Sequence, residues 1–147
     1  MKENFNEAVE MTFIFEGVHN IDTGGDTKYG IARLFHPEIT DAQWAVFSKA
    51  DAEVIYDKGY WNKLNCDSLP RPLDIIVFDT AVNPGPGECK ILLSQCGGNI
   101  STLITLRENY YKHLAAVHPD KFGKDLKGWL NRCETIRKRY CGGQNAS

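Results

Sequence analysis

Two carboxylates and a threonine near the N-terminus have the spacing needed to cleave a glycosidic bond with acid assistance. Glu16 closes an apolar run, Asp22 follows six residues later, and Thr27 lies beside glycine-bearing turns. A carboxylic acid protonates a leaving glycosidic oxygen only if it keeps its proton near neutral pH, and partial burial against apolar groups favours this. A second carboxylate must stay ionised to stabilise an oxocarbenium-like centre or to orient water. The segment therefore suits Glu16 as the proton donor, Asp22 as the ionised partner and Thr27 as the residue that holds the water. The alternative is that Glu16 is a solvated surface residue, as glutamates at helix ends usually are.

Two local elements must bring these side chains together. Asn4 followed by Glu7 resembles a capping box, and the apolar residues after it recur at helical spacing as far as Phe13. This pattern predicts a helix that ends near Glu16, with Gly17 as its stop. Residues 18–35 lack a helical period and are rich in Gly, Thr and Asp, which predicts a hairpin or an irregular lobe.

Helix signals dominate the rest of the chain. We expect helix starts at 40–43 and 48–51, an apolar core helix over 73–82, a break over 83–87, and helices over 88–95, 101–117 and 121–141. The helix through Ile55 and Tyr56 should end before Gly59, and the last six residues should fray. The predicted fold class is mainly α (α+β): one helical domain with a small irregular or β-hairpin lobe near its N-terminus.

Composition limits the possible classes. A chain of 147 residues suits one domain with its own core. Residues 101–147 carry a formal charge of +5 and residues 1–100 carry −7, so the basic end favours an anionic partner or forms a solvated helix face. No apolar stretch is long enough for a membrane span or a signal-peptide core, so we expect synthesis without a leader. The five cysteines form no Cys-x-x-Cys pair, which favours buried reduced thiols over zinc, and we expect no metal and no cofactor.

Several motifs in order resemble one known family. Glu16-Gly17 and the stretch over 22–31 look like the signature of the glycoside hydrolase 108 family of N-acetylmuramidases, many of which are bacteriophage endolysins. Tyr60-Trp61 and the stretches over 66–70 and 78–85 are similar to that family's continuation. Residues 128–132 resemble the end of its companion segment, usually labelled a predicted peptidoglycan-binding domain. The resemblance thus implies one domain over 1–147, with a glycosidase part over about 8–90 and a helical peptidoglycan-binding-like part over about 91–141.

The resemblance implies a lysozyme-like fold and hydrolysis of the β-1,4 bond between N-acetylmuramic acid and N-acetylglucosamine. The general acid falls on Glu16, at the glutamate of the family's Glu-Gly-Gly motif. This chain has Val18 where the second glycine is usual, and its segment between Glu16 and Asp22 is short and lacks the usual prolines. Asp22 and Asp26 are therefore both candidates for the second carboxylate.

Five further side chains are candidates for contacting the sugar. They are Tyr29, Tyr60, Trp61, Asp79 and Asn83. The two neighbouring aromatic residues either stack on sugar faces or belong to the core. Asp79 and Asn83, four apart on one helix face, either line the groove or bond to turns at the helix end, and structural bonding is the favoured interpretation. Trp129 and Arg132 are expected to pack the last helix onto the core.

The predicted function is a peptidoglycan hydrolase for host-cell lysis, acting as a monomer on glycan strands. It would accumulate in the host cytoplasm and reach the wall once the inner membrane is breached, where its basic C-terminal region could bind anionic wall polymers. A lytic transglycosylase would use the same glutamate but let the 6-hydroxyl of the sugar attack. A non-catalytic wall-binding or partner-binding domain is the alternative from another class. Nucleic-acid binding is disfavoured because no recognition motif accompanies the basic charge.

Overall fold

The computed structural model describes residues 2–17, 19–22 and 25–142; for Lys2 and residues 19–22 it describes the backbone alone. The helices are α1 (Lys2–Glu16), α2 (Asp41–Ala45), α3 (Lys49–Tyr56), α4 (Leu73–Val82), α5 (Pro86–Cys96), α6 (Ile100–Val117), α7 (Pro119–Phe122) and α8 (Leu126–Tyr140). The strands are β1 (His19–Asp22), β2 (Gly25–Lys28) and β3 (Ile31–Ala32), and short helical turns η1, η2 and η3 cover Arg33–Phe35, Asp57–Trp61 and Cys66–Ser68. The predicted class, mainly helical with a small β lobe near the N-terminus, is confirmed.

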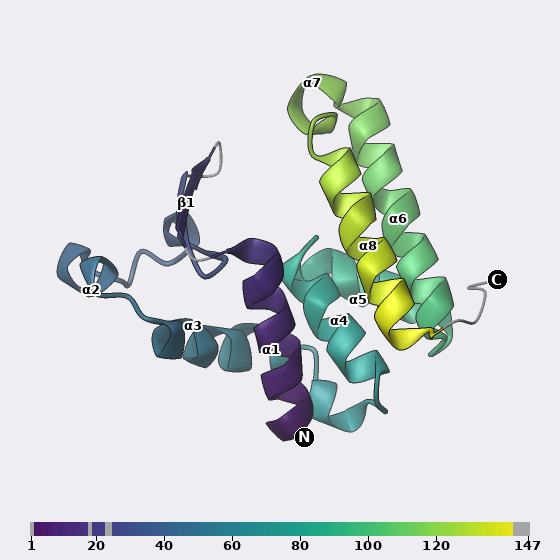
Figure 1. The fold of residues 1–147 in the computed structure, drawn as a ribbon, viewed down its shortest axis with the longest axis horizontal. Helices are drawn as coiled ribbons and strands as arrows, with labels where there is room; N and C mark the ends of the chain where they lie inside the picture. Colours follow the sequence, from purple (N-terminus) through teal and green to yellow (C-terminus); the bar gives the residue numbers. More distant parts are fainter. Residues whose placement is uncertain (1, 18, 23–24, 143–147) are drawn as a thin grey trace.

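Helix α4 forms the centre of the molecule. It occupies the predicted range, and every residue from Leu73 to Ala81 is buried, as expected for a helix that is apolar nearly all round. Helix α1 packs along one side of α4 and α5 along another, α5 contacts α6, and α6 runs beside α8 (Figure 1). The rings of Phe5, Trp61 and Phe78 pack edge-on or tilted at 5.5–5.9 Å between centroids, which ties α1 to the core.

The three strands form an antiparallel sheet in the order β1-β2-β3. Strands β2 and β3 are joined by the two-residue turn Tyr29-Gly30, with φ angles of 53° and 82°. Positive φ at both positions is the geometry of a type I′ hairpin, for which glycine is favoured. The Tyr56 hydroxyl on α3 donates a 2.7 Å hydrogen bond to the Tyr29 carbonyl, which fixes the turn to the helical body.

One face of β2 is covered by Trp44 of α2. The Trp44 indole N–H donates to Asp26 Oδ2 at 2.7 Å, and Lys28 Nζ donates to the Trp44 carbonyl at 2.7 Å. Because side chains alternate along a strand, Thr27 lies on the opposite face of β2. Both helices of this region start at the predicted capping boxes, Thr40 with Gln43 and Ser48 with Asp51.

Several boundary predictions differ from the structure. Helix α5 begins at Pro86, inside the break expected over 83–87. Asn4 is not a cap, because α1 already begins at Lys2 and the Asn4 amide instead donates to Asp74 Oδ2 at 2.8 Å and accepts from Arg71 Nη1 at 3.0 Å. The single helix expected over 121–141 is broken into α7 and α8 by residues 123–125. Helix α7 starts earlier than predicted, with Pro119 in its first turn, where proline has no helical hydrogen bond to lose.

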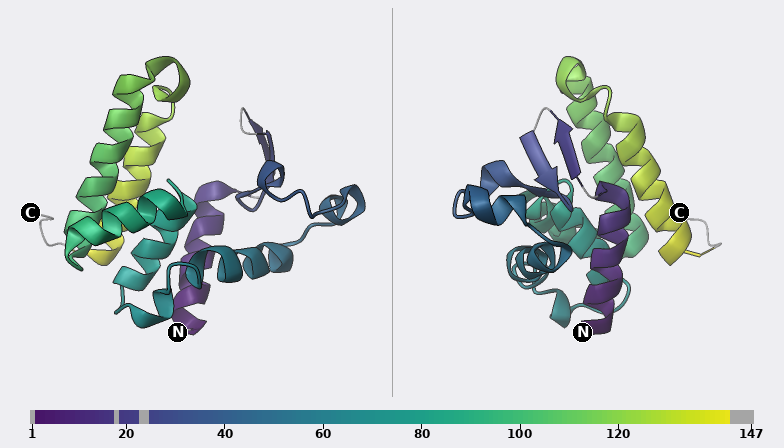
Figure 2. Two further views of the ribbon diagram at one scale, coloured as in Figure 1. Left: turned by 180° about the vertical axis from the view of Figure 1, so that it is seen from behind. Right: turned by 60° about the vertical axis from the view of Figure 1, so that its left-hand side comes forward.

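The arrangement in space defines where a site can lie. The sheet and the α6–α8 hairpin rise on either side of the C-terminal end of α1, with α7 at the tip of the hairpin (Figures 1 and 2). Over the described ranges, no helix combines the length and the apolar character that crossing a bilayer demands.

Candidate active site

Glu16 is the last residue of α1, and its side chain lies between the β2–β3 turn and α8. The side chain is 24% exposed, and its Oε2 forms a close ion pair with Nη1 of Arg132. Gly30 of the turn packs directly against it: a Cβ placed at Gly30 would lie 2.8 Å from Glu16 Cγ and 3.0 Å from Glu16 Cβ. The carboxyl is therefore half-buried and held on two sides, by the guanidinium of Arg132 and by the β2–β3 turn.

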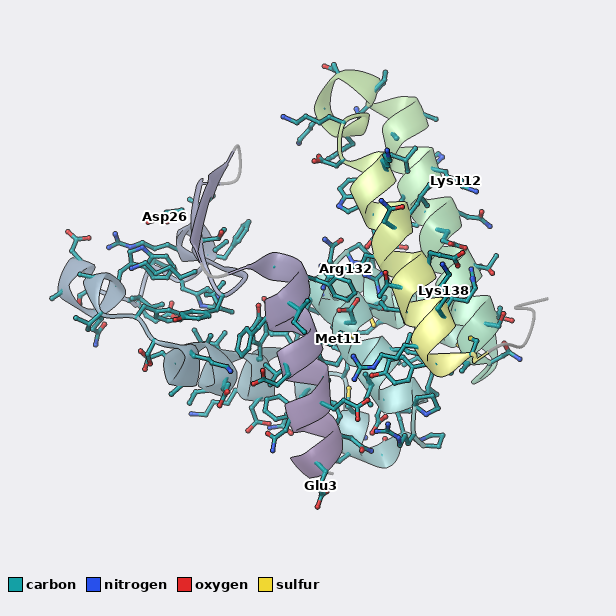
Figure 3. The ribbon with its side chains drawn as sticks, viewed as in Figure 1. Glu3, Met11, Asp26, Lys112, Arg132 and Lys138 are labelled. Atoms are coloured by element: carbon teal, nitrogen blue, oxygen red, sulfur yellow. The ribbon has the colours of Figure 1, made fainter. Side chains whose placement is uncertain are left out.

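Arg132 on α8 is buried, with 8% of its side chain exposed, and it joins Glu16 to Asp79 of α4. It donates from Nε to Asp79 Oδ2 at 3.1 Å and from Nη2 to Asp79 Oδ1 at 2.8 Å. Its guanidinium carbon also lies 4.6 Å from the centroid of the Phe15 ring, a cation–π distance. Figure 3 shows Arg132 at the place where α8 meets the end of α1.

Asp79 is completely buried and has a second basic partner. Arg107 Nη1 on α6 lies 2.8 Å from Asp79 Oδ2, and the Arg107 side chain is 1% exposed. Burial raises the pKa of Asp79, but the guanidinium groups of Arg132 and Arg107 lower it by more, so the pKa lies below its ordinary value. Asp79 therefore stays ionised and anchors both arginines in the core.

A groove of about 340 Å³ opens beside Glu16. Its walls are Gly30, Ala32, Phe35, His36 and Tyr60 on one side and Ala81, Val82, Pro84, Gly85 and Pro86 on the other. Gly30 belongs both to the groove and to the contact with Glu16. Burial and the negative charge of Glu16 both raise the pKa of Tyr60, as expected for a phenol close to that carboxylate. Two of the residues that line the groove, Gly30 and Tyr60, therefore lie close to Glu16.

Strand register relates the other predicted catalytic residues to this groove. Thr27 pairs with Ala32, and residues directly opposite each other in a sheet share a face, so Thr27 lies on the groove side of β2. Asp26 lies on the Trp44 side and takes part in the hydrogen bond described above. The backbone of Asp22 pairs with Gly25, and the Asp22 side chain lies outside what the structure describes.

The five predicted sugar contacts separate into different surroundings. Tyr60 lines the groove, whereas the Tyr29 ring packs edge-on against Phe13 at 5.6 Å between centroids. Trp61 is 2% exposed and donates its indole N–H to Asp67 Oδ1 at 2.9 Å, so it belongs to the core and offers no ring face to a sugar. This corrects the stacking interpretation of Trp61.

Asp79 and Asn83 form structural bonds and do not line the groove, as the favoured interpretation of the sequence has it. Asp79 is enclosed by its two arginines, so it cannot line the groove. The Tyr111 hydroxyl donates to Asn83 Oδ1 at 2.8 Å and lies 3.0 Å from the Asn83 carbonyl oxygen, at the end of α4. Both polar side chains therefore hold α4 to the helices around it.

Sequence reasoning missed Arg132 as the partner of Glu16 and, apart from Tyr60, did not single out the residues that line the groove, Phe35 and His36 among them. Arg132 lies 116 residues from Glu16, and no local spacing predicts such a contact. Phe35 is the last residue of the segment predicted as an irregular lobe, and His36 follows it directly. The available signal was an aromatic residue in a segment that has no helical period. Among the described residues, no cluster of three or more His, Cys, Asp or Glu side chains is placed to hold a metal ion.

Comparison with known proteins first defines the class of fold. The chain is similar to the solved structure of SagA from Brucella abortus, with a TM-score of 0.69 and 22% sequence identity over 92% of this chain and 96% of that chain. This likeness supports a lysozyme-like fold. No curated protein matches the chain.

A family model then identifies the chain more closely. The glycosyl hydrolase 108 model matches residues 9–85, more than half of the chain, and the protein belongs to this family. The resemblance seen in the motifs is thus confirmed at the level of the family, which makes the chain a glycoside hydrolase of a peptidoglycan-degrading class. The match ends before α5, so residues 91–141, the predicted companion segment, lie beyond it.

Proposed function

We propose that this protein is a muramidase that hydrolyses the β-1,4 bond between N-acetylmuramic acid and N-acetylglucosamine, with Glu16 as the proton donor. The observation that carries the proposal is the placement of Glu16, one-quarter exposed at the end of α1 and in contact with the turn that borders the groove. Family membership supports the same chemistry. A half-buried carboxyl beside an open groove can reach a glycosidic oxygen and protonate it.

Asp22 is proposed as the second carboxylate and Thr27 as the residue that holds the attacking water. The register supports this choice over Asp26, because Thr27 shares the groove side of β2 whereas Asp26 is bonded to Trp44 on the other side. The ionised carboxylate would stabilise the oxocarbenium-like centre or orient the water. Asp22→Ala should lose most activity and keep the fold, and near-wild-type turnover would overturn its role.

The groove is proposed to bind the glycan strand. Tyr60 and the exposed Phe35 supply aromatic surface on one wall, and the opposite wall is built from small and proline residues of the α4–α5 junction. Aromatic faces suit the apolar faces of pyranose rings, and the small wall lets the chain approach closely. Phe35→Ala should therefore raise KM more than it lowers kcat.

The test is digestion of purified peptidoglycan, with the released muropeptides identified by mass spectrometry. Wild-type protein should release fragments with N-acetylmuramic acid at the reducing end, and Glu16→Gln should release none. Glu10→Gln is the matched control, since Glu10 lies on the same helix in a surface ion pair with Lys49 at 2.8 Å. Glu10→Gln should keep wild-type activity.

Other products would overturn specific parts of the proposal. Fragments with N-acetylglucosamine at the reducing end would contradict the bond. Anhydro ends would mean a lytic transglycosylase, in which the sugar's 6-hydroxyl replaces water. No release by wild-type protein would contradict catalysis and leave a wall-binding domain.

The biological setting is proposed to be host-cell lysis by a monomer of the phage endolysin type. The protein would act after it passes the inner membrane. The α6–α8 hairpin carries exposed basic residues, among them Lys112 and Lys138 (Figure 3), which suit anionic wall polymers. Because such attraction is screened by salt, binding to intact walls should weaken as ionic strength rises. Salt-independent binding would contradict this part.

A further inference from the structure

One residue that contacts Glu16 closely, Arg132, comes from α8, outside the part of the chain that the family model matches. Arg132 reaches Glu16 with Nη1 while Nε and Nη2 hold Asp79. A guanidinium has its donors in a fixed planar fork, so its two bonds to Asp79 determine where Nη1 points. The Arg132 side chain therefore fixes the position of the Glu16 carboxyl relative to the buried centre of α4.

The charges of the cluster indicate what this contact does. Arg107, Arg132 and Asp79 are all enclosed, and together they carry one excess positive charge. When Glu16 is ionised, its negative charge balances that excess. A proton donor becomes ionised as its proton passes to the leaving oxygen, so the excess positive charge is neutralised at the moment of transfer. A fixed charge that meets a developing one lowers the barrier without further reorganisation.

We propose that Arg132 is a positioning residue for the reaction: it fixes the carboxyl of Glu16 beside the groove and stabilises the carboxylate that forms as the proton leaves. The proposal rests on the proposed function of Glu16. It makes the α8 segment, previously a candidate peptidoglycan-binding part, a component of the catalytic centre. Because Arg132 is enclosed by α1 and α4, it acts through Glu16 and not on the sugar.

Arg132→Met tests this with Arg137→Met as a matched control. Arg137 lies on the same helix and pairs with Glu108 at 2.5 Å, far from Glu16 in the network. Arg132→Met leaves Asp79 paired with Arg107, so no buried charge is isolated. We expect kcat to fall about 10- to 100-fold with KM nearly unchanged, as for a misplaced catalytic group.

Arg132→Lys covers the case in which the methionine variant does not fold. Lysine keeps the charge against Asp79, but a single ammonium cannot hold both Asp79 oxygens and Glu16 at once. We expect a folded protein with lowered kcat and preserved KM. Wild-type kcat in Arg132→Lys, or a kcat for Arg132→Met equal to that of Arg137→Met, would overturn the proposal.

A second readout separates this inference from the proposed function. Hydrogen exchange of the last turn of α1, which Gly17 N–H closes on the Phe13 carbonyl at 2.9 Å, should quicken in both Arg132 variants but not in Arg137→Met. If the wild-type protein releases no muropeptides, the proposed function fails while this exchange still measures positioning. Unchanged exchange in the Arg132 variants would overturn the positioning role whatever the activity.

Discussion

Replacing Gly30 with alanine should move Glu16, the proposed proton donor, directly. The new Cβ would lie 2.8 Å from Glu16 Cγ and 3.0 Å from Glu16 Cβ, and also against the Tyr56 hydroxyl. Ordinary van der Waals contact begins near 3.4 Å, so the Glu16 side chain must shift by about half an ångström or more. Gly98→Ala is the matched control, because its φ of 78° is close to the 82° of Gly30 and nothing lies within 4 Å of its Cβ position.

The two substitutions share one energetic cost and differ in another. Alanine at a left-handed φ costs about 1–2 kcal/mol in both variants. Overpacking adds about 1–3 kcal/mol at Gly30 alone. For a chain of this size, that difference lowers Tm by about 2–12 °C in Gly30→Ala relative to Gly98→Ala.

The assay is thermal unfolding followed by circular dichroism, together with kcat from muropeptide release. We expect kcat of Gly30→Ala to fall about tenfold or more, because small displacements of a catalytic group are costly, whereas Gly98→Ala should keep it. Equal Tm and equal kcat in the two variants would refute the close packing of Gly30 on Glu16.

Three further predictions concern the core. Asp79→Asn should lower the free energy of unfolding by about 3–5 kcal/mol in urea titrations, because it removes the counterion of buried Arg107 and leaves Arg132 with Glu16 alone; a loss within the error of the wild type would contradict the network. Burial raises the pKa of Asp79, but its two arginines lower it by more, so the folded-state pKa lies below the ordinary value. The contribution of Asp79 to the free energy of unfolding should therefore be full above the unfolded pKa of about 3.9 and vanish as pH falls through the folded pKa. The free energy of unfolding of Asp79→Asn should therefore fall less steeply with decreasing pH than that of the wild type, and an equal slope in acid would refute this. Iodoacetamide should label the half-buried Cys141 first, and mass spectrometry would show this order. Burial raises the pKa of Cys66 and Cys89 to about 12 and that of Cys133 to about 11, which keeps these thiols protonated and slow to react. Equal labelling of all five thiols would contradict this prediction.

Locally determined features were predictable from the sequence. The capping boxes at Thr40 and Ser48 depend on residues three positions away, and both are present. The apolar run of α4 predicted a buried helix with its bounds, because no polar face interrupts it. The position of Glu16 at a helix end was also predictable from a local signal, because Gly17 follows it directly.

Features that depend on distant partners were not predictable. Asn4 has the sequence of a cap, but bonds to Asp74 and Arg71 place it inside α1. The sequence left open whether Trp61 stacks on a sugar or belongs to the core, and its burial against α1 and α4 decides for the core. Nothing in the local pattern around Arg132 indicates that it reaches Glu16.

The link between the first and last long helices also bears on how the protein is made. Arg132 lies 116 residues after Glu16 and 53 after Asp79, so during synthesis both carboxylates leave the ribosome long before their guanidinium partner. Contacts of such long range form late, because the intervening chain must be ordered first. The nascent chain would therefore carry the proposed catalytic centre unassembled until α8 docks, and on that proposal hydrolytic competence would be one of the last properties it acquires.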